Sequence, residues 1–235
     1  MIKEVIILAG GLGTRLRSLI SDMPKCMAPV AGRPFLSYVI THLQKEGIEK
    51  FIFSVGYKNE MIIDFINSHF PFLDSNFSIE EEPLGTGGAI KFACNKTTGK
   101  TILVVNGDTL FMIDLDKLAM FHNMCGADCT LSLKPMQNFD RYGVVELNKD
   151  YSIKSFNEKK FYEGGLINGG VYALHPLRFL EKDLPEKFSF EKEYLEKYFD
   201  KTRMYGVVQD KYFIDIGIPE DYERAQKELG TRDNK

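Results

Sequence analysis

The stretch that decides the fold reads Val5-Ile6-Ile7-Leu8-Ala9-Gly10-Gly11-Leu12-Gly13-Thr14-Arg15-Leu16. It opens with a short, continuous apolar run, which is typical of a strand buried on both faces of a parallel sheet. Glycines follow that run at once. In open α/β sheets ligands bind beyond the carboxyl ends of the strands, and glycines there let backbone N–H groups approach phosphate oxygens closely. The stretch therefore predicts an α/β fold with an anion site at the end of its first strand.

Two common phosphate-binding motifs do not match this loop. The Walker A motif needs a lysine at a fixed distance after its glycines, and the dinucleotide fingerprint needs a third glycine where Leu16 stands. A tight turn without a ligand is therefore one interpretation. Arg15 and Lys25 favour a polyphosphate site instead, because an arginine supplies a bidentate fork and a lysine supplies a movable point charge.

Outward from this loop, short apolar runs alternate with amphipathic patterns. The runs at 51–55, 77–81 and 101–105 predict strands, and the patterns at 35–46, 60–70 and 86–94 predict helices. Such alternation predicts a mostly parallel central sheet with helices on both faces.

The pattern changes after about residue 127. Strand-like runs at 130–134, 144–147, 153–156 and 171–174 follow one another with turns between, and helical patterns occupy 190–199 and 219–229. We expect antiparallel strands added to the sheet and a lid over one edge. No linker or repeat interrupts the chain, so we predict one domain over 1–230 and a flexible polar tail at 231–235.

Composition limits the classes of function. The chain has 235 residues, of which 44% are hydrophobic and 27% charged, so it can bury a sizeable core. A formal net charge of −3 argues against broad binding to nucleic acid or to a membrane surface. No apolar run approaches the ~18 residues that span a bilayer, and four scattered cysteines form no disulfide framework. We expect a cytoplasmic protein with small-molecule partners, and a homodimer stays open.

The glycine-rich loop and the later motifs together resemble the signature of sugar-1-phosphate nucleotidylyltransferases. In chain order these motifs are Gly11-Leu12-Gly13-Thr14-Arg15-Leu16, Pro24-Lys25, Pro29-Val30-Ala31-Gly32-Arg33-Pro34, Glu82-Pro83-Leu84-Gly85-Thr86-Gly87-Gly88-Ala89, Asn106-Gly107-Asp108, Tyr142-Gly143-Val144-Val145, Asn157-Glu158-Lys159, Asn168-Gly169-Gly170-Val171-Tyr172 and Phe213-Ile214-Asp215-Ile216-Gly217. The resemblance implies a single Rossmann-like nucleotidyltransferase domain. It assigns 1–126 to the nucleotide and 127–230 to the sugar phosphate, with the antiparallel strands on the sugar side.

The resemblance implies that a sugar 1-phosphate attacks a nucleoside triphosphate to give a nucleotide sugar and pyrophosphate. The attacking phosphate oxygen is already anionic, so no general base is required. The problem is electrostatic, because two highly negative substrates must approach each other. We expect Arg15 to neutralise the leaving pyrophosphate and Lys25 to hold oxygens around the α phosphate. Surface salt bridges are the alternative roles.

Two carboxylates are the expected metal ligands. Asp108 follows a buried strand, and the side chain of Asp215 points away from those of Ile214 and Ile216 on an extended chain. A helix N-cap is the alternative role for Asp108, but Asp114 suits that role better. The resemblance implies that the pair binds one Mg²⁺ that bridges the reacting phosphates, and oxygen ligands suit that ion.

The resemblance also implies two sets of binding residues. The nucleotide set is Leu8, Ala9, Gly10, Gly11, Gly13, Thr14, Glu80, Pro83, Gly85, Thr86 and Asn106. The sugar-phosphate set is Gly143, Glu158, Lys159 and Asn168. Relatives often have a proline where Lys160 stands, and its loss loosens the turn that would position Lys159.

Glu80 indicates which base is used. Relatives that use uracil or thymine tend to have an amide near this position, whereas a carboxylate can accept from both N1–H and the 2-amino group of guanine. This favours GTP, although backbone atoms near Gly85 could read the base instead. The whole pattern is most similar to guanylyltransferases that act on D-glycero-α-D-manno-heptose 1-phosphate for bacterial surface polysaccharides such as capsule and lipopolysaccharide.

Other functions stay open at this point. A mannose 1-phosphate guanylyltransferase or a uridylyltransferase would share these motifs. A glycosyltransferase would need an Asp-x-Asp metal motif, and Asp114-Leu115-Asp116 has that spacing but begins a helix. A non-catalytic homologue should have lost Arg15, Lys25, Asp108 or Asp215, and all four are present. A zinc site at His122, Cys125 and Cys129 lacks a fourth ligand, so buried thiols explain these cysteines better.

Overall fold

The computed structural model describes residues 1–11 and 22–232. The predicted site residues Gly13, Thr14 and Arg15 lie outside the described residues. Strand β1 (Glu4–Leu8) lies inside a nine-stranded sheet, with neighbours on both sides. Its residues Val5, Ile6 and Ile7 are fully buried, as the continuous apolar run predicts.

The first half of the chain builds the parallel part of the sheet. β1 pairs in parallel with β4 (Lys50–Val55) and with β6 (Ile102–Asn106), and β5 (Asp74–Ile79) pairs in parallel with β4. The order is therefore β6-β1-β4-β5. Because these strands are parallel, their carboxyl ends meet at one edge of the sheet, where a ligand is expected.

The second half extends the sheet with antiparallel strands, as predicted. β11 (Tyr162–Leu174) pairs antiparallel with β6, β8 (Cys129–Phe139) and β9 (Val144–Leu147), and β10 (Ile153–Asn157) pairs with β9. β12 (Met204–Val208) pairs in parallel with β8. Strands β8 and β11 are much longer than the predicted 130–134 and 171–174. Their outer ends carry polar residues and glycines, which give no apolar run to detect.

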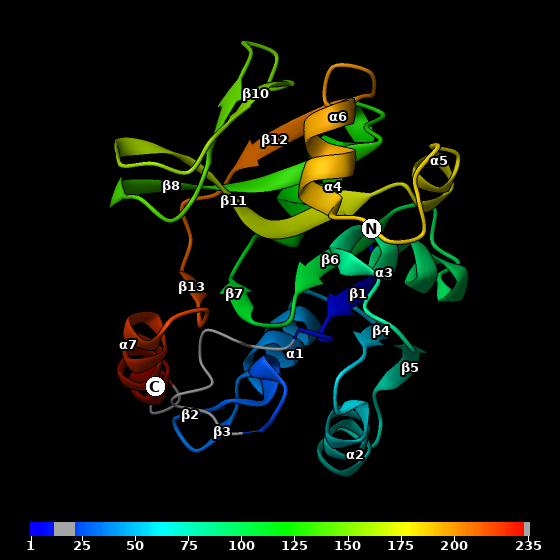
Figure 1. The fold of residues 1–235 in the computed structure, drawn as a ribbon, viewed down its shortest axis with the longest axis vertical. Helices are drawn as coiled ribbons and strands as arrows, with labels where there is room; N and C mark the ends of the chain where they lie inside the picture. The colour runs from blue at the N-terminus through cyan, green and yellow to red at the C-terminus, as the bar shows by residue number, and fades with distance from the viewer. Residues whose placement is uncertain (12–21, 233–235) are drawn as a thin grey trace.

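Helices cover both faces of the sheet (Figure 1). One face carries α1 (Phe35–Lys45), α2 (Asn59–His69), α4 (Leu115–Met124) and α7 (Pro219–Arg232). The other carries α3 (Gly85–Ala93), α5 (Pro176–Leu180), the π-helical segment η4 (Phe190–Leu195) and α6 (Glu196–Tyr198). Val5 and Ile7 pack in the first core and Ile6 in the second, which confirms the two-sided burial that the first strand predicts.

Strand β12 and helix α5 were not predicted, and several shorter elements escaped prediction as well. These are the two-stranded sheets β7 (Thr109–Phe111) with β13 (Phe213–Asp215) and β2 (Pro29–Val30) with β3 (Arg33–Pro34), and the 3₁₀ turns η2 (Lys25–Met27) and η3 (Cys94–Lys96). Two or three residues are too few to show a period. Helix α7 ends at Arg232, so the first two residues of the predicted tail are helical. Among the residues that the structure describes, no helix is long and apolar enough to cross a membrane.

Candidate active site

A cavity of about 850 Å³ opens at the carboxyl ends of the parallel strands. It is lined by Leu8, Gly10, Gly11, Ser54, Gly56, Tyr57, Asn59, Ile79, Glu80, Glu81, Pro83, Gly85, Thr86, Ala89, Asn106, Asp108 and Glu191. The ends of β1, β4, β5 and β6 thus each contribute to one concave site, at the edge where the sheet topology leads us to expect a ligand.

Most of the predicted nucleotide set lies in this lining. Its members there are Leu8, Gly10, Gly11, Glu80, Pro83, Gly85, Thr86 and Asn106. Ala9 lies behind the wall, 3% exposed, and its N–H donates to the Ser54 carbonyl at 2.8 Å. Gly85 has φ +73, and a Cβ there would lie 2.5 Å from the Phe188 carbonyl oxygen. Only glycine therefore fits the start of α3 without a shift of the backbone.

Glu80 has its carboxylate held from two sides. Its Oε1 accepts a hydrogen bond from the Ser54 hydroxyl at 3.1 Å, and its Oε2 accepts one from the Leu84 N–H at 2.9 Å. The Glu80 N–H donates to the Val55 carbonyl at 2.8 Å. Backbone and side chain are both fixed at the wall of the cavity, at the position that the sequence assigns to base recognition.

Lys25, Asp108 and Asp215 form a second charged group, which we call the lysine–aspartate cluster. The Lys25 Nζ lies 2.5 Å from Asp108 Oδ2 and 3.4 Å from Asp215 Oδ1. Burial works to lower the pKa of Lys25, but the two carboxylates outweigh it and raise that pKa. Burial and the charge of Asp108 raise the pKa of Asp215, against the opposing effect of Lys25. The cluster therefore holds two carboxylates together around one cation.

The short sheet β7–β13 brings these carboxylates together. Asp215 pairs with Thr109, the residue after Asp108, and the Ile216 N–H donates to the Asp108 carbonyl at 3.1 Å. The Gly217 N–H donates to Asp215 Oδ1 at 2.8 Å, and a Cβ on Gly217 would lie 2.9 Å from that oxygen. Ile214 and Ile216 are fully buried, which confirms the predicted opposite orientation of Asp215.

The geometry of the cluster fits a divalent cation. Two carboxylates already converge on one positive charge, and Mg²⁺ and similar ions prefer oxygen ligands. Within 1–11 and 22–232 no group of three or more His, Cys, Asp or Glu side chains could hold a metal. A metal at Asp108 and Asp215 would therefore need further oxygen ligands from bound phosphates or water.

The predicted sugar-phosphate residues lie outside the lining of the cavity. Glu158 and Lys159 are exposed in the turn between β10 and β11. The Asn168 amide donates to the Tyr172 hydroxyl at 2.9 Å and accepts from the Gly170 N–H at 3.1 Å, at an irregularity of β11. A Cβ on Gly143 would lie 2.5 Å from the Asn157 carbonyl oxygen, so this glycine has a packing role. Their role toward the sugar phosphate stays a prediction.

Eight lining residues belong to none of the predicted sets: Ser54, Gly56, Tyr57, Asn59, Ile79, Glu81, Ala89 and Glu191. Ser54 is a polar residue inside an otherwise apolar strand, which is a signal that the sequence does contain. Glu191 lies in η4, and its Oε2 accepts from the Thr86 hydroxyl at 2.9 Å. It is 105 positions from Thr86, so nothing local in the sequence indicates the contact.

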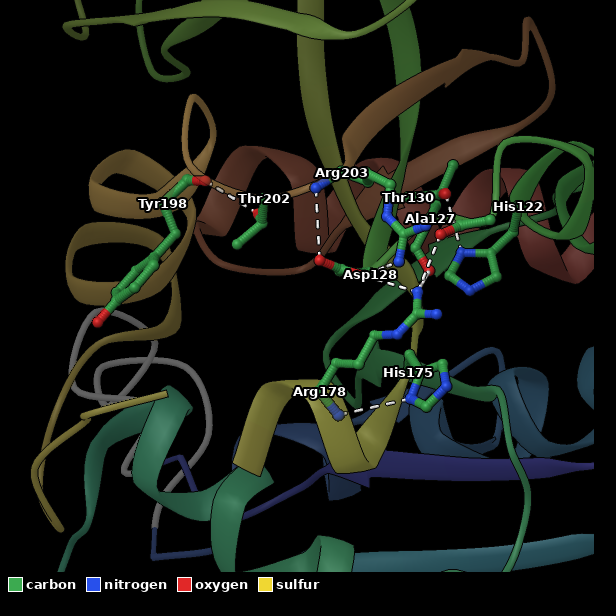
Figure 2. Close-up of polar contacts among 10 residues, drawn as sticks. His122, Ala127, Asp128, Thr130, His175, Arg178, Tyr198, Thr202 and Arg203 are labelled. Atoms are coloured by element: carbon green, nitrogen blue, oxygen red, sulfur yellow. Dashed lines mark hydrogen bonds and ion pairs between the residues drawn. The ribbon is translucent and has the colours of Figure 1, made fainter. Parts of the chain in front are cut away.

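His122 and Cys129 are two of the three residues for which a zinc site was considered and disfavoured, and they lie next to a cluster of charged side chains. Cys129 begins β8, and the buried His122 has Nδ1 2.9 Å from the Thr130 hydroxyl. Beside them Asp128 binds two arginines, Arg178 at 2.7 Å and Arg203 at 3.1 Å, and we call these three residues the aspartate–arginine cluster (Figure 2). The Arg178 guanidinium also donates to the Gly126 carbonyl at 2.9 Å.

Comparisons with known proteins give matches over nearly the whole chain. A family model described as nucleotidyl transferase matches residues 4–232. A D-glycero-alpha-D-manno-heptose 1-phosphate guanylyltransferase of Aneurinibacillus thermoaerophilus is 51% identical over 96% of this chain and 98% of its own. One of the same name from Campylobacter jejuni is 47% identical over 93% and 96%. The crystal structure of HddC from Yersinia pseudotuberculosis complexed with GMP-PN matches with a TM-score of 0.87 and 38% identity, over 97% of this chain and 100% of that one.

Proposed function

The chain belongs to the nucleotidyl transferase family, and on that premise we propose that it is a sugar-1-phosphate guanylyltransferase that makes GDP-heptose. Its substrates are GTP and D-glycero-α-D-manno-heptose 1-phosphate. The observation that carries this proposal is the 51% identity to an enzyme of that name over nearly the full length of both chains. Mannose-1-phosphate guanylyltransferases among the relatives are more distant, at 33% identity or less.

The reaction follows from the chemistry of the two substrates. A phosphate oxygen of the sugar 1-phosphate attacks the α phosphorus of GTP, and the bond to the bridging oxygen of the β phosphate breaks. That oxygen keeps the electron pair, and pyrophosphate leaves. No proton has to be removed from the nucleophile, so the residues mainly position the phosphates and neutralise their charge.

Two cations carry the catalytic part of the proposal. Arg15 is assigned to the β and γ phosphates, which become the leaving pyrophosphate. Lys25 is assigned to oxygens of the α phosphate, and its position beside Asp108, which lines the cavity, supports this role. The nucleotide binds to the glycine-rich loop and the residues that line the cavity.

Family members generally use a divalent metal, and we assign Mg²⁺ to Asp108 and Asp215. When bound, Mg²⁺ supplies positive charge to the reacting phosphates. Asp108 and Asp215 would hold the ion, and the role assigned to Lys25, which contacts both carboxylates, is to bind oxygens of the α phosphate. The sugar phosphate binds on the side of β8 to β11, at Gly143, Glu158, Lys159 and Asn168. Residues 1–126 supply most of the nucleotide site and residues 127–230 the sugar site, with Glu191 as a contribution of the second half to the cavity.

The location and assembly are further parts of the proposal. We assign the enzyme to the cytoplasm, and its four free cysteines support that assignment. Its product would serve surface polysaccharides such as capsule or lipopolysaccharide. Homodimer formation stays a prediction that light scattering on the purified protein can test.

A substrate matrix tests the function. Pyrophosphate release is measured for GTP, UTP, ATP and dTTP, each with heptose, mannose and glucose 1-phosphates. We expect the highest kcat/KM for GTP with D-glycero-α-D-manno-heptose 1-phosphate. A higher value for mannose 1-phosphate, or for UTP, would replace the heptose or the guanine assignment respectively.

A further inference from the structure

Ser54 is a hydroxyl at a position where the fold favours an apolar side chain. It lies in β4, directly beside Leu8 of β1 and Ser78 of β5, and it is 1% exposed. Ile52, two residues earlier on the same face of the strand, is fully buried in an apolar core. A buried hydroxyl is costly unless it finds a hydrogen-bond partner, and Ser54 finds Glu80 Oε1 at 3.1 Å.

Strand pairing explains why Ser54 reaches Glu80. Ser54 is paired with Ser78, and Glu80 comes two residues after Ser78, just beyond the end of β5, so the Ser54 and Glu80 side chains lie diagonally across the two strands. The Ser78 hydroxyl is buried and has no hydrogen-bond partner among the described residues. The two serines thus present the same chemistry on neighbouring strands, and one of them contacts Glu80.

The contacts leave acceptor capacity on both carboxylate oxygens. A carboxylate offers about four lone-pair sites. Ser54 uses one on Oε1 and the Leu84 N–H uses one on Oε2, so, among the contacts of the described residues, each oxygen retains one. Guanine presents two parallel donors, N1–H and the 2-amino group, to which such a pair of oxygens can bind if the plane of the carboxylate is fixed. The terminal torsion of a glutamate is otherwise broad.

We propose that Ser54 is a positioning residue for base selection, because its hydroxyl fixes the plane of the Glu80 carboxylate for the two donors of guanine. The proposal deepens the guanylyltransferase function and rests on it. Without the Ser54 hydroxyl, the Leu84 N–H would be the one hydrogen bond that the described residues still donate to the carboxylate, and the group could turn about that bond.

The test compares GTP with ITP, whose base lacks the 2-amino group. Dissociation constants are measured by calorimetry without sugar phosphate, so that no turnover occurs. The wild type is expected to bind GTP on the order of tenfold more tightly than ITP, which is what one hydrogen bond to a charged acceptor is worth. Glu80→Gln should abolish most of that preference.

Ser54→Ala should reduce the GTP-to-ITP preference to about twofold, chiefly by weakening GTP. Ser78→Ala is the matched control: it removes the same atom from the paired position without touching Glu80, and its preference should equal that of the wild type. Ser54→Cys keeps the shape of the side chain and is a weak donor, so it should give an intermediate value. It also replaces Ser54→Ala if that variant does not fold.

The outcomes distinguish the positioning role of Ser54 from base reading by Glu80. A Ser54→Ala preference equal to that of Ser78→Ala, with Glu80→Gln still impaired, overturns the role of Ser54. A wild type that does not distinguish GTP from ITP overturns base reading by Glu80, and the role of Ser54 with it. Guanylyl transfer itself is judged independently, by pyrophosphate release from the wild type with GTP and heptose 1-phosphate.

Discussion

The lysine–aspartate cluster and the aspartate–arginine cluster have opposite compositions. The first sets one ammonium against two carboxylates, and the second sets one carboxylate against two guanidinium groups (Figure 2). In the first, burial and the Asp108 charge raise the pKa of Asp215. In the second, burial works to raise the pKa of Asp128, but hydrogen bonds from Arg178 and Arg203 outweigh it and lower that pKa.

The difference separates a candidate binding site from a structural contact. The Asp128 carboxylate accepts hydrogen bonds from both arginines. Arg178 also donates to backbone carbonyls at the turn before β8. The carboxylates of the lysine–aspartate cluster outnumber their cation, and Asp108 faces the cavity. Excess negative charge beside a cavity is suited to a further cation, whereas the aspartate–arginine cluster ties α5 to β8.

The largest effect should follow from neutralising the first cluster. Asp108→Asn or Asp215→Asn should reduce turnover by about 10³-fold or more, because metal-ion charge is worth several kcal/mol in such transition states. Pyrophosphate release is measured as Mg²⁺ is varied, with the exposed Asp64→Asn on α2 as the control. Full activity of the wild type in excess EDTA would contradict the metal assignment.

Arg15→Ala adds to this comparison a cation whose role in the site is predicted from the sequence alone. Loss of a charge contact to the leaving pyrophosphate should cost about 2.7–4 kcal/mol, or roughly 10²–10³ in kcat. The melting temperature should stay close to that of the wild type. A collapse of the melting temperature, with normal activity per folded molecule, would instead show that Arg15 has a structural role.

Asp128→Asn should have the reverse pattern, with lower stability and unchanged activity. Breaking this pair should cost about 2 kcal/mol, less than a fully buried pair would, because the Arg203 side chain is 51% exposed. That corresponds to a melting temperature lower by roughly 4–8 °C. Urea denaturation measures the loss, and a change in kcat at 25 °C would show that the two clusters are not separate in function.

The smallest effect concerns His122, next to the aspartate–arginine cluster. Burial, reinforced by His175 and Arg178, lowers its pKa from 6.5 to about 4. The unfolded chain therefore binds the proton first as the pH falls below 6.5, so stability is lost between pH 6.5 and 4. At pH 5.5 the loss should be about 1 kcal/mol. His122→Gln should flatten this part of the profile in denaturation experiments, and an unchanged slope would assign the pH dependence elsewhere.

The sequence predicted most of the parallel half of the fold because β1, β4 and β6 contain continuous apolar runs, whereas β5 begins with polar residues and was expected at 77–81 instead of Asp74–Ile79. β4 and β6 match the expected runs within one residue at each end. Glu80 was expected to contact the nucleotide base, and it does line the cavity. It could be predicted because its motif is continuous in the sequence. The N-cap role of Asp114 is confirmed as well, since its side chain accepts from the Lys117 N–H.

The features that sequence reasoning missed depend on pairing between distant segments. The sheet β7–β13 joins residues about a hundred positions apart, and its strands have three residues each. Glu191 reaches the cavity only because η4 packs near the start of α3. Ser54 could have been flagged as a hydroxyl in a buried strand, but its partner follows from the register of β4 and β5.

The position of β13 near the end of the chain has a consequence for synthesis. The ribosome releases the chain from its N-terminus, so the strands around Glu80 emerge long before Asp215 does. The parallel strands β1, β4, β5 and β6 are therefore all translated well before β13, which carries the second carboxylate. The lysine–aspartate cluster is therefore completed only when β13 pairs with β7 at Thr109, about a hundred residues after Asp108 has been translated.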